Sequence, residues 1–287
     1  MDKLLKKKLL SLFKEFTLFC KTNNLTYYAA YGTAIGAVRH HGIIPWDDDI
    51  DVWMPRDDYE KLLKLKSTLL NTNYEITNIE NKGYYLYFAK FCNRNTSIIE
   101  REGEPIIGLY IDIFPLDNYD ESRGGHLTKL SDIYRILWLL YGHGYRNYHR
   151  YEIQKHLYHK EFTRLLIVLL DTLLKIIRIP LKFIITKINN RLKSVPYTGK
   201  VWMYSIIKSE CRIYPSSWFG KGIKVPFEDF EVILPTEYDK VLYTIYGDYM
   251  TPPIEANRKS HHFRYFIDLN QRLSRSTIIK KLYRTDL

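Results

Sequence analysis

The sequence predicts an α+β fold of α/β-like character, in which strands and helices surround a basic helical insertion. Strand-like and helical patterns alternate over residues 1–119, and mixed structure returns after residue 193. Between these blocks, residues 124–193 contain long helical patterns, few turn signals and many basic side chains. Because no internal repeat or Gly/Ser-rich linker divides the chain, we expect a single domain over residues 1–287 that contains the insertion.

The elements outside the insertion follow from local patterns. The opening residues form an amphipathic helix, and the strand-forming segment at 26–30 leads into a turn at Gly32 and Thr33. A short helix is expected at Ala34–Val38, and a strand with apolar residues at every second position at Ile50–Met54. A helix with a proline at its start follows at Arg56–Leu70. Two strands rich in aromatic residues are expected at Tyr84–Phe91 and Ile106–Phe114. The closing block contains a strand-like segment at 227–235 and two helices, of which the first is Thr236–Tyr246.

Composition excludes several classes of protein. Hydrophobic residues make up 46% of the chain and charged residues 26%, so we do not expect wholesale disorder. Apolar runs such as Leu165–Leu170 are far shorter than the roughly 20 residues that span a bilayer. The lysine-rich start is unlike a signal peptide. Cys20, Cys92 and Cys211 show no CxxC spacing, so we expect reduced thiols and a cytoplasmic protein.

The basic charge is concentrated in the middle of the chain. The net charge is +11, and residues 125–225 hold 18 Lys and Arg against five Asp and Glu. Such a field suits a nucleic acid, an anionic membrane face or an acidic polymer. We expect no nucleic-acid partner, because the basic residues alternate with long aliphatic runs and not with stacking aromatic residues.

The apolar stretch at 165–188 leaves two interpretations open. It is punctuated by cations and broken at Pro180. It is either a pair of core helices in an inserted subdomain or a pair of interfacial helices in peripheral contact with an anionic membrane.

The sharpest chemical signal is a group of carboxylates, with Asp47, Asp48, Asp49 and Asp51 inside five positions. On a strand, Asp49 and Asp51 project from the same face, while the apolar residues between and after them point into a core. Two carboxylates on one face form a site for a hard divalent cation, Mg²⁺ or Mn²⁺. The alternative is a solvated acidic turn.

Two further elements suit the same chemistry. Gly32 and Thr33 stand at a helix start, where backbone N–H groups favour phosphate, and Arg39 at the end of that helix pairs with phosphate or forms a surface salt bridge. Asp112 lies in the middle of an apolar strand, where a carboxylate needs a partner; an adjacent metal site supplies one. Asp112 then binds metal or accepts the proton of an incoming hydroxyl. Asp117 is expected to be a turn residue or a helix cap.

These elements together resemble a known family. The segment GTAIGAVRHHGIIPWDDDIDVWMPRDDYEKL (32–62) resembles the signature of the LicD-type phosphotransferase family, which includes the fukutin-related proteins and has the nucleotidyltransferase superfold. The likeness continues in AKFCNRNTSIIE (89–100), LYIDIFPLD (109–117), YGDYMTPP (246–253) and the element Arg258…His261-His262. It covers most of the chain except the middle block and implies a nucleotidyltransferase-type mixed sheet flanked by helices.

The resemblance implies an enzyme. Family members transfer a phosphorylated alcohol or polyol, of the phosphocholine, phosphoglycerol or phosphoribitol type, from a CDP-linked donor. The acceptor is a hydroxyl of a cell-surface glycan or its lipid-linked precursor, as in teichoic acid, capsule polysaccharide or lipopolysaccharide, and CMP is released. We therefore expect a cytoplasmic protein that associates peripherally with the inner face of the cytoplasmic membrane. The alternative is a nucleotidyltransferase that adds NMP to an acceptor and releases pyrophosphate.

The resemblance also assigns residues. Asp49 and Asp51 would hold the metal and Asp112 would complete the site. The expected substrate-binding residues are Gly32, Thr33, Arg39, Asp48, Lys90, His261 and His262, although Lys90 could instead lie along the sheet with its charge in water, and the adjacent histidines could be surface residues. Tyr31 stands where the family usually has glycine, which bears on the fit of the donor.

Overall fold

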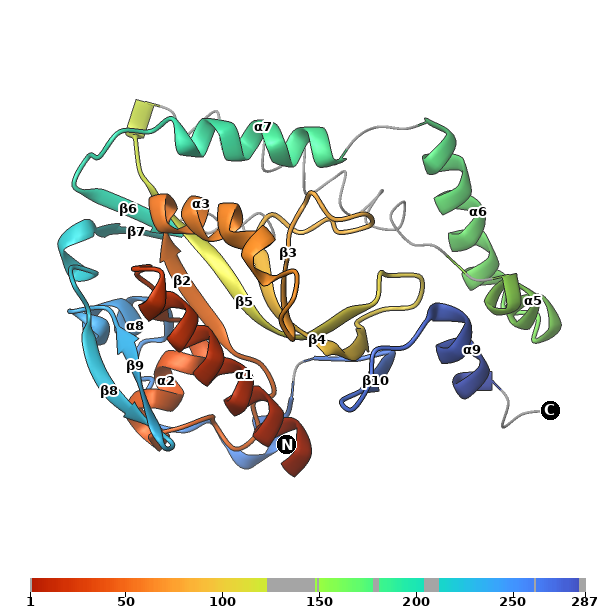
Figure 1. Ribbon diagram of the computed structural model, residues 1–287, viewed down its shortest axis with the longest axis horizontal. Helices are drawn as coiled ribbons and strands as arrows, with labels where there is room; N and C mark the ends of the chain where they lie inside the picture. The colour runs from red at the N-terminus through yellow and green to blue at the C-terminus, as the bar shows by residue number, and fades with distance from the viewer. Residues whose placement is uncertain are drawn as a thin grey trace.

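The computed structural model describes residues 2–122, 148, 150–177, 181–203, 212–260 and 262–283, and it has the expected α+β fold. A curled mixed sheet runs in the order β1-β2-β5-β4-β10, with β3 on β4 and with β6 and β7 extending from β5 (Figure 1). Its strands are Tyr28–Ala29, Asp51–Pro55, Tyr74–Thr77, Ala89–Ile99, Ile107–Asn118, Lys200–Met203 and Arg212–Pro215 for β1 to β7, and Phe266–Asp268 for β10. The hairpin of β8 (Ile223–Phe227) and β9 (Phe230–Leu234) is a separate sheet.

Helices surround this sheet. They are α1 (Lys3–Thr22), α2 (Tyr31–His40), α3 (Arg56–Lys64), α5 (Arg150–Tyr158), α6 (Phe162–Ile177), α7 (Leu181–Lys193), α8 (Tyr238–Tyr246) and α9 (Arg275–Tyr283), with 3₁₀ turns at Leu65–Leu69, Ser216–Trp218 and Glu255–Asn257. The predicted helix at the N-terminus is confirmed as α1. The carboxylate of Asp2 caps it by accepting hydrogen bonds from the N–H groups of Leu4 and Leu5, at 2.7 and 2.9 Å.

The face of α1 that meets the sheet carries the core. Its buried side chains include Leu9, Leu12, Phe13 and Phe16, and the ring of Phe16 lies 5.5 Å from that of Phe91 on β4. The spacing of these residues is that of one helical face, which is why the amphipathic pattern places α1 against the sheet.

The path of β5 corrects one sequence prediction. Asp117 is neither a turn residue nor a helix cap: it is fully buried in β5 and forms a fork with Arg56, with 2.6 Å from Nε to Oδ1 and 2.9 Å from Nη2 to Oδ2. The strand continues past Pro115 because β4 pairs with β5 only as far as Ile113, so the N–H that proline lacks is not required by that ladder.

The segment predicted as a strand at Tyr84–Phe91 is also shifted along the chain, since β4 begins at Ala89. Residues 84–88 instead form a non-strand segment whose aromatic side chains pack against α7 and β6. This cluster of buried residues comprises Tyr85, Tyr87, Phe88, Ile185, Ile188, Leu192 and Trp202. The helix α7 therefore packs against the core, as the first interpretation of the insertion expected.

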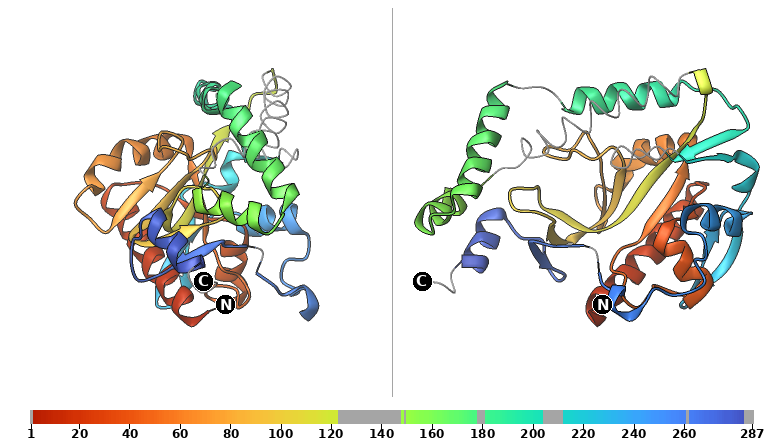
Figure 2. Two further views of the ribbon diagram at one scale, coloured as in Figure 1. Left: turned by 90° about the vertical axis from the view of Figure 1, so that its right-hand side faces the viewer. Right: turned by 180° about the vertical axis from the view of Figure 1, so that it is seen from behind.

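The helix α6 differs from α7. Figure 2 shows α5 and α6 at the end of the molecule opposite the β8–β9 hairpin. The side chains of Phe162, Leu166 and Leu169 are 74%, 68% and 66% exposed. Within the described residues, no helix combines the length and apolar character needed to cross a membrane. Much of the insertion, including the predicted break at Pro180, lies outside the described residues, as does Cys211.

Candidate active site

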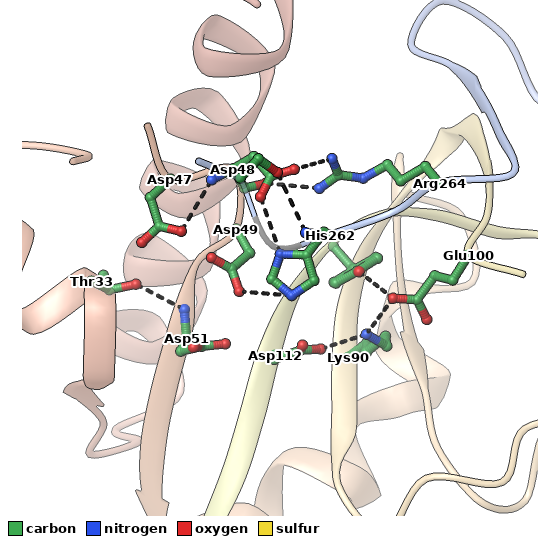
Figure 3. A network of polar contacts seen from close by, with 12 residues as sticks. Thr33, Asp47, Asp48, Asp49, Asp51, Lys90, Glu100, Asp112, His262 and Arg264 are labelled. Carbon is green, nitrogen blue, oxygen red and sulfur yellow. Dashed lines mark hydrogen bonds and ion pairs between the residues drawn. The ribbon is translucent and has the colours of Figure 1, made fainter. Parts of the chain in front are cut away.

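Three neighbouring strands place charged side chains in one row. Asp51 on β2 is the register partner of Asp112 on β5 in a parallel pair, and Lys90 on β4 is the partner of Asp112 in an antiparallel pair. Directly paired residues project from the same face of a sheet. The three side chains therefore share one face, as Figure 3 shows.

Asp49 joins this row from the loop that precedes β2. It lies two positions before Asp51, and in Figure 3 its carboxylate stands on the same side as those of Asp51 and Asp112. The structure thus brings together the three carboxylates singled out in the sequence. The backbone explains why, because the N–H of Asp112 donates to the carbonyl of Ile50 at 2.9 Å and so fixes the β2 entry beside the middle of β5.

The carboxylates resist ionisation together. Burial raises the pKa of Asp51 well above its ordinary value, and the charges of Asp49 and Asp112 raise it further. Burial also raises the pKa of Asp49 and of Asp112, despite the cations beside them. Asp47 follows the same rule, since burial and Asp49 bring its pKa to about 7. These raised pKa values mean that negative charge on the carboxylates is unfavourable in the protein alone. A bound cation would stabilise their charged forms.

Lys90 is an internal counter-ion. Its side chain is 1% exposed, and its Nζ lies 2.7 Å from Asp112 and 3.8 Å from Glu100. The hydroxyl of Tyr110 donates to Glu100, and the ring of Tyr110 lies 3.4 Å from the lysine Nζ. The alternative in which the charge of Lys90 lies in water is therefore wrong.

A second set of cations holds Asp48. Arg264 contacts its carboxylate with Nη1 and donates from Nη2 to its backbone carbonyl at 2.8 Å. His262 reaches both neighbouring acids, with 3.1 Å from Nδ1 to Asp48 and 3.4 Å from Nε2 to Asp49. Although burial opposes it, these contacts lower the pKa of Asp48, and the hydrogen bond to Asp48 raises that of His262 to about 8. His261 lies outside the described residues.

Residues at the start of α2 contact the acid cluster. The backbone N–H of Asp51 donates to the hydroxyl of Thr33 at 2.9 Å. A Cβ on Gly32 would lie 2.4 Å from Oδ2 of Asp47, so a larger residue at this position would displace that carboxylate. Tyr31 has a φ of 45°, a left-handed conformation that glycine adopts more easily, and its ring packs 5.0 Å from Trp53. The chain therefore holds a strained tyrosine immediately before the site.

Arg39 lies at the other end of α2. Its Nη1 donates to the backbone carbonyl of Tyr249 at 2.5 Å. Within the part of the chain that the structure describes, Arg39 forms no ion pair with a carboxylate, so the surface salt bridge is not observed there.

Some site residues were not predicted from the sequence. Asp47 was visible in the acidic run but was given no separate role. Arg264 follows the predicted histidines by two positions, yet it reaches an acid 216 positions away. Glu100 had no local signal, because its place depends on the register of β4 against β5.

The acids suit a hard divalent cation. Among the described residues, one ligand atom each of Asp48, Asp49 and His262 lies within 4.8 Å of the others, close enough for the three to share an ion. Arg264 and His262 already contact Asp48, and Lys90 already contacts Asp112, whereas no hydrogen bond in the described part of the chain reaches the carboxylate of Asp51. Carboxylate oxygens without proton donors are ligands that Mg²⁺ accepts.

We expect the metal-free protein to lose stability as the pH rises from about 5.5 to 8.5. A histidine whose folded pKa is raised stabilises the fold below its unfolded value of about 6.5, and this contribution disappears as the pH passes the folded value of about 8. An aspartate with a raised pKa, such as Asp47, acts in the same direction. Thermal melts in EDTA measure the effect. A melting temperature independent of pH in this window would contradict it, and Mg²⁺ should reduce the slope.

Comparisons with known proteins find similarity to one family. Residues 24–158 match the family described as LicD/FKTN/FKRP, nucleotidyltransferase domain. The chain is 26% identical over 266 residues to the lipopolysaccharide cholinephosphotransferase LicD of Haemophilus influenzae, with 89% of this chain and 93% of that protein covered. Uncharacterized proteins of Rickettsia typhi and Rickettsia prowazekii are 30% and 32% identical over 43% and 40% of this chain, and the matches span only 40% and 42% of those proteins. Residues 24–158 are thus similar to the LicD-type phosphotransferase family, and the relative from Haemophilus influenzae extends the similarity over most of the chain.

Proposed function

We propose that this protein transfers a phosphorylated alcohol, of the phosphocholine type, from a CDP-linked donor to a hydroxyl of a lipopolysaccharide or another cell-surface glycan. The observation that carries the proposal is the row of Asp51 and Asp112 with Asp49 above it on one face of the sheet. The relative from Haemophilus influenzae, whose name specifies cholinephosphate and lipopolysaccharide, supports the substrate class.

In this proposal Asp49 and Asp51 hold a divalent cation, Mg²⁺ or Mn²⁺, and Asp112 completes the set. When bound, the cation neutralises the donor diphosphate and the charge that develops on the leaving phosphate. The acceptor oxygen forms a bond to the phosphorus that carries the alcohol, the bond from that phosphorus to the CMP oxygen breaks, and the hydroxyl proton passes to a carboxylate of the cluster.

The remaining site residues position these groups. Thr33 ties the start of β2 to α2 through its hydrogen bond to Asp51. Lys90 orients Asp112 and opposes the burial that raises the pKa of this acid, and Arg264 orients Asp48 and helps to lower its pKa. Because most of these side chains are buried or half-buried, water competes little with the charges, and phosphoryl transfer depends chiefly on such positioning.

The direct test is a transfer assay with CDP-choline, Mg²⁺ and a deacylated lipopolysaccharide acceptor. The proposal expects CMP and a phosphocholine-modified glycan in equal amounts, and no product in EDTA. Release of pyrophosphate from a nucleoside triphosphate, seen by phosphorus NMR, would instead support the alternative nucleotidyltransferase reaction. A panel of CDP-alcohols in the same assay identifies the transferred group.

We also propose peripheral contact with an anionic membrane at the cytoplasmic face, through α6. Exposed apolar side chains follow one face of this helix: Phe162, Leu166, Leu169, Leu170 and Leu173. The excess of cations in the insertion would favour an anionic lipid surface. A lipid-linked acceptor would then reach the enzyme at the membrane surface.

We expect the protein to float with phosphatidylglycerol vesicles and to float poorly with phosphatidylcholine vesicles. The double variant Leu166→Glu/Leu169→Glu should lose most of this binding, because both charges would have to enter the interface. The control is Leu70→Glu, which changes a leucine of similar exposure, 64%, at the end of the 3₁₀ turn after α3. Equal flotation of the double variant and the wild type would rule out α6 as the contact.

A further inference from the structure

Arg39, Trp46 and Arg258 form a basic aromatic group beside the acid cluster that the chemistry above does not use. The Cζ atoms of Arg39 and Arg258 lie 6.0 and 5.1 Å from the centroid of the Trp46 ring. The ring of His40 also meets this indole edge-on, at 5.7 Å. Trp46 immediately precedes Asp47, so the group lies at the entrance to the acidic loop.

Backbone carbonyls hold both guanidinium groups in place. Arg39 donates from Nη1 to the carbonyl of Tyr249 at 2.5 Å, and Arg258 donates from Nε to the carbonyl of Pro253 at 2.8 Å. These bonds orient the side chains without neutralising them. For the residues that the structure describes, no carboxylate lies within ion-pair distance of either guanidinium.

This arrangement contrasts with the other arginines close to the core. Arg56 is paired with Asp117, and Arg264 is paired with Asp48. Two like charges beside each other are unfavourable, and accordingly burial and Arg258 lower the pKa of Arg39. Two oriented guanidinium groups that form no ion pair within the described residues are groups that suit an anion.

We propose that Arg39 and Arg258, oriented over Trp46, bind a phosphate group of a substrate. The planar fork of arginine matches phosphate oxygens, and each of the two guanidinium groups lies within 6.0 Å of the centre of the same indole, so both are close to the place where a phosphate would bind. The binding of phosphate itself does not depend on the proposed function. Only the identity of the molecule that carries the phosphate rests on it, and that molecule is either the nucleotide donor or a phosphorylated acceptor.

Titration calorimetry of the full-length protein with inorganic phosphate in EDTA tests the site. Without metal, the acid cluster repels anions, so binding reports on the arginine pair. We expect the wild type to bind phosphate and the variants Arg258→Gln and Arg39→Gln to bind at least tenfold more weakly. Arg258 is exposed beside the Glu255–Asn257 turn, so its variant should fold normally, and a thermal melt checks this.

The matched control is Lys240→Gln, which removes another cation over an indole, 5.8 Å from the ring of Trp218, where Glu237 already neutralises the charge. It should bind phosphate like the wild type. No binding by the wild type, or unchanged binding by both arginine variants, would overturn the proposal.

A second titration, with saturating Mg²⁺ and CDP, distinguishes the two sources of the phosphate. Continued binding of phosphate assigns the site to the acceptor, and displacement assigns it to the donor. Because no transfer is measured, failure of the choline-phosphate reaction would leave this result intact. Loss of phosphate binding would likewise leave the tests of Asp49 and Asp51 unaffected.

Discussion

Asp51→Asn should reduce the transfer rate by about 10³-fold or more, which corresponds to about 4 kcal/mol of lost transition-state stabilisation. The amide is nearly the same size but removes one negative charge from the row formed with Asp112 and Asp49. In the proposed reaction that charge helps to hold the cation of the donor diphosphate, so the loss should appear mainly in the rate constant. Steady-state assays with CDP-choline as the donor measure it.

The same substitution should make the metal-free protein more stable. Burial and neighbouring carboxylates raise the pKa of Asp51, so its charge is unfavourable in the fold and a neutral amide relieves it. A higher melting temperature in EDTA together with lost activity would distinguish a site acid from a structural one. Asp57→Asn is the control, because Asp57 is an exposed acid in the first turn of α3; it should alter neither property. Full activity in Asp51→Asn would remove the proposed site.

Asp117→Ala should lower the free energy of unfolding by about 3–5 kcal/mol, the largest structural effect that we expect. The side chains of Asp117 and Arg56 are 0% and 7% exposed, and their two hydrogen bonds form a fork. Removal of Asp117 leaves the charge of the buried Arg56 guanidinium largely unpaired. Its remaining carboxylate partner is Glu60, at 3.2 Å. Urea denaturation monitored by circular dichroism measures the change.

An exposed ion pair provides the comparison for this prediction. Lys61→Ala breaks a 2.8 Å contact with Asp58, but the lysine is 60% exposed, so its loss should change stability far less than Asp117→Ala does. The apolar double variant Arg56→Met/Asp117→Leu should recover much of the stability lost in Asp117→Ala. A loss below about 1 kcal/mol in Asp117→Ala would mean that the fork contributes little.

The sequence predicted the parts of the site that local patterns encode. The acids of the β2 entry and the helix after it lie within one short segment, and Asp112 is conspicuous because a lone carboxylate in an apolar strand needs a partner. The general fold class followed from the alternation of strands and helices, and the similarity to the LicD family was visible in its signature motif.

Features set by long-range register could not be predicted in this way. The pairing of Arg56 with Asp117 depends on β5 continuing through Pro115, which a local rule treats as the end of a strand. The burial of Lys90 depends on the register of β4 against β5. The helix α6 is more apolar than α7, yet α7 is the one that packs against the aromatic residues at 84–88, while side chains of α6 stay exposed. Composition alone would have assigned the core to the wrong helix.

The acid cluster carries its own positive charges, and this affects how the protein matures. Lys90 and Arg264 are built into the fold beside Asp112 and Asp48, so part of the repulsion is cancelled before any ion arrives. Newly made chains can therefore reach their final shape in a compartment poor in divalent ions. Ion availability would then govern when the finished protein works, and not whether it is made.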